Sequence, residues 1–102
     1  MQDHRLQQAR IKIDQIDAAM AELFEQRMAA VREVIAYKID HQLPILDASR
    51  EEAVIEKGCD RIQENELKEY YRELLIKQME LSRRYQQTLL AAVKKDESCS
   101  EP

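Results

Sequence analysis

The chain has 102 residues, of which 44% are hydrophobic and 35% are charged, and its formal net charge is −4. A single domain of this length has a modest core unless it oligomerises. The acidic balance argues against a general nucleic-acid binder, because such proteins present a basic face to phosphates. With one Gly and two Pro, and with strong helix formers dominant, the composition favours an all-α fold.

Several further classes of protein are disfavoured by individual residues and segments. The N-terminus is polar, and no run of about 18 apolar residues is present, so we expect a cytoplasmic protein without a membrane span. Cys59 and Cys99 have no metal-ligand spacing, and His4 and His41 are isolated. We therefore expect no disulfide framework, no metal and no cofactor.

The first predicted element is one helix over about residues 4–39, which contain no Gly or Pro, with Asp3 as a plausible N-cap. Such a helix would be about 54 Å long at 1.5 Å per residue. It would overhang a compact monomer, whose radius of gyration is near 13 Å at this length, and expose its apolar stripe. We therefore expect an intertwined homodimer in which a second copy covers the stripe, made of Leu6, Ile13, Ile16, Met20, Leu23, Phe24, Val31, Val34 and Ile35.

Two shorter helices are predicted after Pro44, which ends the first helix because a residue preceding proline is pushed away from helical angles. The second starts near Asp47 or Ser49, since either can act as N-cap, and ends near Asn65. The third spans about residues 66–94. Their expected inward residues are Ala48, Ile55, Cys59 and Ile62 on the second helix, and Leu67, Tyr71, Leu74, Leu81, Tyr85 and Leu89 on the third. The expected domain is 1–94, followed by a polar tail, 95–102.

Cations interrupt the apolar stripe of the first helix. On a helical wheel, Arg27 and Lys38 differ by about 20° near the centre of the stripe, and Arg10 lies towards its edge. Any one of these side chains can reach solvent or pair with a buried acid. Three together would each need a buried partner, so they favour a site that binds an anion.

The other two helices add polar groups to the same inward set. Glu51 shares the inner face of the second helix, whereas Asp47 and Arg50 lie at its start, where a cap and a local surface ion pair would also explain them. On the third helix, Ser82 and Gln86 follow Met79 at i, i+3, i+7 spacing. Cations, a carboxylate, a hydroxyl and an amide suit a small hydroxylated dianion. Without a Cys or His nucleophile or a metal cluster, covalent or metal-assisted chemistry has little support.

Four segments resemble the all-α chorismate mutase family over about residues 6–90. They are "ARIKIDQID", "EQRMAAV", "AYKIDHQLPILDASREE" and "MELSRRYQ", and their order and separations are specific although each alone is weak. The resemblance implies small intertwined dimers that act on chorismate. It places the catalytic and substrate-binding residues at Arg10, Arg27, Lys38, Asp47, Arg50, Glu51, Ser82 and Gln86.

The family reaction converts chorismate to prephenate by a Claisen-type rearrangement, in which an ether C–O bond breaks as a C–C bond forms. The resemblance implies catalysis by holding a compact conformer and stabilising charge on the ether oxygen, with no covalent intermediate. It implies that Arg10, from the other subunit, and Arg27 grip carboxylates. Lys38 and Gln86 would donate hydrogen bonds to the ether oxygen.

The remaining implied roles concern the ring of the substrate. Glu51, with help from Asp47, would hold the ring hydroxyl, while Ser82 and Arg50 would support the ring carboxylate and the surrounding ions. The expected apolar walls are Val34, Ile55 and Met79.

Two other functions stay open at this point. Isochorismate-pyruvate lyase shares the fold and binds a similar dianion, although the segment "PILDASRE" favours the mutase. A non-catalytic helical dimer would explain the apolar stripes. It would leave Arg27, Lys38 and Glu51 buried without a ligand, at a cost in stability.

Overall fold

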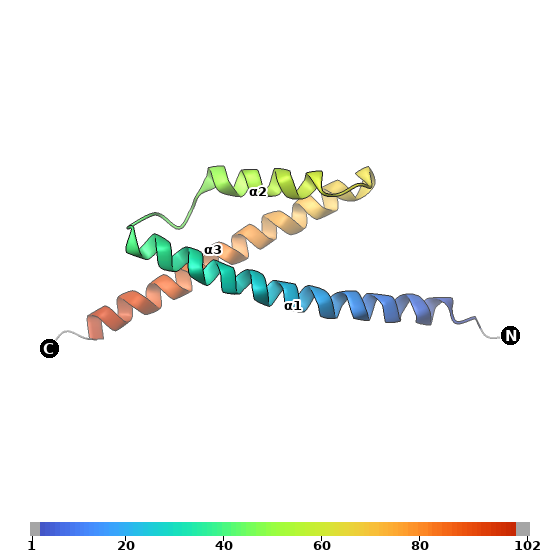
Figure 1. The fold of residues 1–102 in the computed structure, drawn as a ribbon, viewed down its shortest axis with the longest axis horizontal. Helices are drawn as coiled ribbons and strands as arrows, with labels where there is room; N and C mark the ends of the chain where they lie inside the picture. Colours follow the sequence, from blue (N-terminus) through green and yellow to red (C-terminus); the bar gives the residue numbers. More distant parts are fainter. Residues whose placement is uncertain (1–2, 100–102) are drawn as a thin grey trace. The chain divides into compact units, whose positions relative to one another are not determined.

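A computed structural model describes residues 3–99 of the chain, and the side chains of residues 3–96. It contains α1 (Arg5–Asp40), α2 (Ala48–Asp60), a single 3₁₀ turn η1 (Asn65–Leu67) and α3 (Lys68–Cys99) (Figure 1). No strand occurs within residues 3–99. The prediction of an all-α chain of three helices with a very long first helix is confirmed.

The chain divides into two units, Met1–Ala30 and Val31–Pro102. The first contains most of α1. The second contains the last part of α1 together with α2 and α3. The domain boundary expected between residues 94 and 95 remains a prediction.

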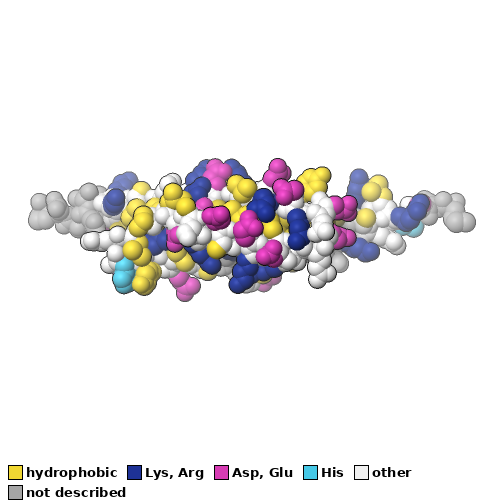
Figure 2. Space-filling view, turned by 90° about the horizontal axis from the view of Figure 1, so that it is seen from above, with side chains coloured by type: hydrophobic (Ala, Val, Ile, Leu, Met, Phe, Trp, Pro, Cys, Tyr) yellow, Lys and Arg dark blue, Asp and Glu magenta, His cyan; other side chains and the backbone are white. Residues whose placement is uncertain are grey.

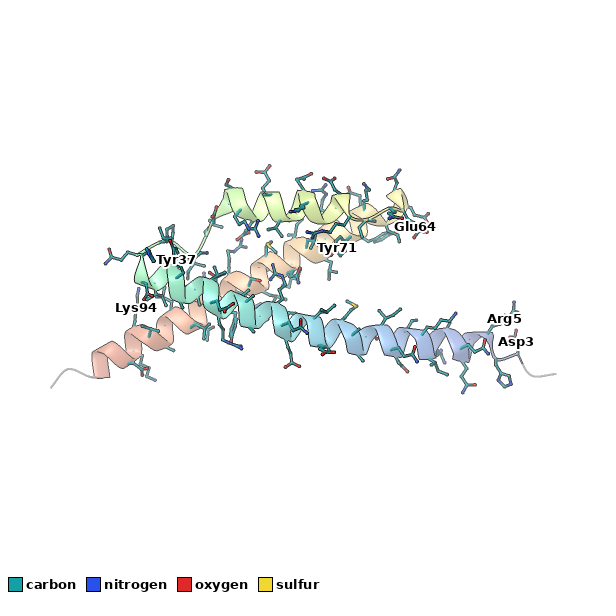
Figure 3. The ribbon with its side chains drawn as sticks, viewed as in Figure 1. Asp3, Arg5, Tyr37, Glu64, Tyr71 and Lys94 are labelled. Carbon is teal, nitrogen blue, oxygen red and sulfur yellow. The ribbon has the colours of Figure 1, made fainter. Side chains whose placement is uncertain are left out.

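The start of α1 is held by Asp3. The Arg5 main-chain N–H donates to Asp3 Oδ1 at 3.0 Å, and the Arg5 guanidinium Nη2 lies 2.7 Å from Oδ2 (Figure 3). The bond from the Arg5 side chain lowers the pKa of Asp3 below its usual value. Asp3 therefore satisfies a free N–H of the first turn, as predicted, although it lies two residues before the first helical residue.

The apolar residues of α1 in the first unit are largely exposed. Leu6 has 63% of its surface exposed and Leu23 has 61%, and the same holds for Ile13, Ile16, Met20 and Phe24 to differing degrees. Figure 2 shows hydrophobic side chains among acidic and basic ones on one face of the described chain. A stripe of this size is unusual on a monomeric surface.

The end of α1 is a tight left-handed turn. Leu43 N–H donates to the Lys38 carbonyl at 2.8 Å, Gln42 N–H donates to the Ile39 carbonyl at 3.3 Å, and Gln42 has a φ of 54°. This is the Schellman arrangement, in which glycine is the usual residue at the left-handed position. The His41 ring stacks on Tyr37 with centroids 3.9 Å apart.

We expect Gln42→Gly to stabilise the chain by about 0.5–1 kcal/mol, because glycine adopts a positive φ without the Cβ penalty. The measurement is the midpoint of urea unfolding. Gln63→Gly, in the exposed connection after α2, is the matched control, since no positive φ occurs there. Equal effects of the two variants would contradict this account of the turn.

Helix α2 begins at the predicted place and ends earlier than predicted. The side chain of Asp47 caps it by accepting the Arg50 N–H at 3.0 Å. The helix stops at Asp60 and not near Asn65, because Arg61 and Ile62 close its end with tight bonds to carbonyls three residues back. The chain then passes through η1 into α3.

Helices α2 and α3 lie side by side in the second unit, as Figure 1 shows. Gly58 permits their close approach, since a Cβ on it would lie 2.5 Å from Leu75 Cδ1. The buried apolar residues of this unit are Val31, Ile35, Cys59, Leu75 and Met79.

The inward face of α3 differs from the predicted one. Of the residues predicted to face inward, Leu67 lies in η1, Leu74 is half exposed, and the others, Tyr71, Leu81, Tyr85 and Leu89, are partly buried. The fully buried residues of α3 are Leu75, Met79, Ser82 and Gln86. Met79, Ser82 and Gln86, which share one side of the helix by their spacing, therefore lie on the part of α3 that faces the core of the second unit. Helix α3 also continues beyond the predicted Lys94 to Cys99, and residues 100–102 of the predicted tail lie outside the described residues.

Candidate functional site

Lys38 lies in the last turn of α1, half-buried in the second unit. Its Nζ donates to the main-chain carbonyl of Ile45 at 2.6 Å and to Gln86 Oε1 at 3.1 Å. The first bond ties the connection between α1 and α2 to the side chain. Because an ammonium group carries three N–H donors, one remains after these two bonds.

Gln86 on α3 is only 6% exposed, and its orientation follows from the bond with Lys38. The amide oxygen accepts from the Lys38 ammonium, so the amide NH₂ group points away from that nitrogen and keeps its donor character. Lys38 and Gln86, which are 48 residues apart in sequence, thus place two N–H donors side by side.

Glu51 forms the second polar contact of the site. Its Oε1 accepts from Arg83 Nη1 at 2.6 Å, and the two side chains are 19% and 31% exposed. Glu52 is exposed. Glu51 is the more buried of the two residues, in agreement with the predicted inner face of α2, although both line the pocket between α2 and α3.

Helix α3 connects these two contacts. Ser82, Arg83 and Gln86 lie within one turn of one another on the helix, where residues three or four apart are neighbours. Ser82 is 6% exposed and engaged in a polar interaction. A line of polar contacts therefore runs from the end of α1, through α3, to the first turn of α2.

Asp47 and Arg50 lie at the start of α2, and both are exposed. The Asp47 carboxylate caps the helix through the Arg50 main chain, so the capping interpretation of this residue is confirmed. Its second oxygen stays available to accept another bond. Any role of these two side chains toward a ligand remains a prediction.

Arg10 and Arg27 belong to the first unit. Arg10 is exposed on α1, whereas Arg27 is half-buried and makes a polar interaction. Their expected convergence with Lys38, which belongs to the second unit, remains a prediction.

Two pockets of the second unit border the polar contacts. One, of about 430 Å³, lies between α2 and α3 and is lined by Glu51, Arg83, Ile55 and Arg72, among others. The other, of about 540 Å³, is lined by Lys38, the connection between α1 and α2, and α3 as far as Lys94, which is labelled in Figure 3. Of the predicted apolar walls, Ile55 lines the first pocket, Met79 is buried and Val34 is 47% exposed.

Two ion pairs, Glu51 with Arg83 and Glu56 with Arg72, line the first pocket. Arg72 Nη1 donates to Glu56 Oε1 at 2.8 Å, and this bond is the main reason why the pKa of Arg72 is raised above its usual value. In each pair a guanidinium engages one oxygen of the carboxylate. Within residues 3–99, no three His, Cys, Asp or Glu side chains cluster closely enough to hold a metal ion.

Comparison with known protein families shows a match over most of the chain. The family described as chorismate mutase type II matches residues 9–87. The chain belongs to the chorismate mutase type II family. No curated protein and no solved structure matches the chain.

The segment that matches the chorismate mutase type II family includes every predicted site residue, because it begins before Arg10 and ends after Gln86. Among the described residues, no helix is both long and apolar enough to span a bilayer. Membership of this family implies chorismate as the substrate.

Arg83 is the contact residue that the sequence reasoning missed. It follows Met79 by four residues and precedes Gln86 by three, so helical spacing alone places it beside these two predicted residues. Next to Arg84 it resembles part of an exposed basic dipeptide, so the sequence alone does not single it out. In the structure Arg84 is exposed and Arg83 is half-buried.

Proposed function

We propose that the chain is a chorismate mutase that rearranges chorismate to prephenate without a covalent intermediate. The observation that carries the proposal is the hydrogen bond from Lys38 Nζ to Gln86 Oε1. It holds the two residues implied to stabilise the ether oxygen next to each other, with the oxygen of the amide occupied and its NH₂ group free to donate.

Catalysis in this proposal is electrostatic. The ether C–O bond breaks as the new C–C bond forms within one molecule, so no atom enters or leaves and no proton is transferred. Negative charge grows on the ether oxygen, and donors fixed beforehand stabilise it at no cost of reorganisation. The Lys38 bond to Ile45 O supports this role, because it restrains the ammonium before the ligand arrives.

The other roles follow the family pattern. Arg27, and Arg10 from a partner subunit, bind the two carboxylates, and Arg forks suit that geometry. Glu51 and Asp47 accept a hydrogen bond from the ring hydroxyl of chorismate, while Ser82 and Arg50 support its ring carboxylate. We infer that the enzyme serves aromatic amino-acid biosynthesis in the cytoplasm and needs no cofactor.

The deciding experiment is an assay of purified protein with chorismate. Loss of the ultraviolet absorbance of chorismate, with prephenate identified by mass and by acid conversion to phenylpyruvate, would support the proposal. Release of pyruvate from isochorismate instead would indicate the lyase. If neither compound reacts and a bicyclic dianionic transition-state mimic leaves the melting temperature unchanged, the chain is a non-catalytic helical protein.

We also propose an intertwined homodimer with two composite sites. The exposed apolar residues of α1 before residue 30 support it, because a second copy would remove them from water. Sedimentation equilibrium measures the mass of the assembly.

The composite site predicts complementation between two inactive variants. In a dimer of one Arg10→Ala chain and one Lys38→Ala chain, one site lacks both side chains and the other site has both. After random exchange of subunits, about one site in four is intact, so mixing should restore about a quarter of wild-type activity. Mixtures that stay inactive, although mass spectrometry detects mixed dimers, would contradict a cross-subunit Arg10.

A further inference from the structure

Arg83 and Glu51 form the least exposed ion pair among the described residues. The Nη1 to Oε1 distance is 2.6 Å, and both side chains are less exposed than those of the nearby Arg72 and Glu56 pair. The two residues come from different helices, α3 and α2. Holding them together therefore fixes the Glu51 carboxylate relative to the face of α3 that carries Ser82 and Gln86.

The charges of the proposed site create a difficulty that Arg83 resolves. Chorismate is a dianion, so a bare carboxylate on Glu51 would repel it while accepting its hydroxyl. A guanidinium bound to one carboxylate oxygen offsets that charge and leaves the second oxygen to accept a hydrogen bond. Lys38 does not take this part in the described structure, because its ammonium group donates to Ile45 O and Gln86 Oε1 and forms no ion pair with Glu51.

We propose that Arg83 is a positioning residue for substrate binding. It orients the Glu51 carboxylate and offsets its negative charge, which would otherwise repel the dianionic substrate. The inference rests on the proposed function of this site. Arg83 itself does not touch the reacting atoms, and it acts through the Glu51 carboxylate. Its effect should therefore fall on binding of chorismate and less on the rearrangement.

The test is steady-state kinetics of Arg83→Gln with chorismate. We expect KM to rise about tenfold while kcat changes by less than about twofold, because binding in ground and transition states is weakened alike. Arg84→Gln is the matched control, since it removes the same charge from the adjacent, exposed position. Arg83→Lys should recover part of the wild-type KM, because it keeps the charge and loses the fork.

A double-mutant cycle separates positioning from general support of the fold. In a Glu51→Gln background no carboxylate remains to orient or neutralise, so Arg83→Gln should add less than about twofold to KM. Melting temperatures of all variants report any loss of folding, and Arg83→Lys keeps the test valid if Arg83→Gln is poorly folded.

The outcomes distinguish this inference from the function on which it rests. A wild-type chain that does not convert chorismate would overturn both. An active wild-type chain in which Arg83→Gln matches Arg84→Gln, or in which the effect of Arg83→Gln persists without Glu51, would overturn the role of Arg83 alone.

Discussion

Lys38→Ala should lower kcat by about 10²–10³-fold, the usual cost of removing one preorganised donor to a developing oxyanion. The residue has a second, structural contact, because its Nζ holds the Ile45 carbonyl at 2.6 Å. Loss of that bond costs about 1 kcal/mol, which would shift the melting temperature by several degrees. The two effects differ enough in size to be read separately by kinetics and calorimetry.

Lys94→Ala is the control for Lys38→Ala. Lys94 lines the same pocket from α3 and is exposed, so its removal deletes an equal charge nearby without deleting the proposed donor. Its kcat should stay close to wild type. Near-normal turnover of Lys38→Ala would remove Lys38 from the catalytic assignment.

Gln86→Glu should convert a pH-independent donor into one that works only in acid. An amide donates at any ordinary pH, whereas a carboxylate must be protonated before it can donate. Below the pKa of the new side chain the donor is present, and above that pKa it is lost. Activity should therefore rise by about one order of magnitude for each pH unit of fall, until protonation is complete.

Gln87→Glu is the matched control for this profile, since it makes the same change one residue further along α3 at an exposed position. It should retain the pH dependence of the wild type. A flat profile for Gln86→Glu, measured as kcat from pH 4 to pH 8 or thereabouts, would count against a direct contact between Gln86 and the ether oxygen.

The long first helix could be predicted because its signal is local. No Gly or Pro interrupts residues 5–40, and Pro44 follows soon after. The cap at Asp47 is local for the same reason. The early end of α2 was not predictable in this way, because the tight bonds of Arg61 and Ile62 break the pattern without a Pro or Gly at those positions.

The site could be predicted in part. Helical wheels find that Lys38 and Glu51 face inward, since one helix suffices to place each of them. They cannot find the Lys38 to Gln86 bond or the Glu51 to Arg83 pair, because both depend on packing between helices. The buried face of α3 was misjudged for a related reason: it carries apolar residues on more than one side, and packing selects among them.

The thiol of Cys59 lies in the contact between α2 and α3, next to Gly58, and is 4% exposed. Thiol reagents need access to the sulfur, so Cys59 can react only when α2 moves away from α3. In a Cys99→Ser background its rate of labelling therefore reports how often this part of the chain opens. If ligand binding holds Glu51 on α2 to Arg83 on α3, saturating ligand should slow that labelling, a readout of occupancy that requires no turnover.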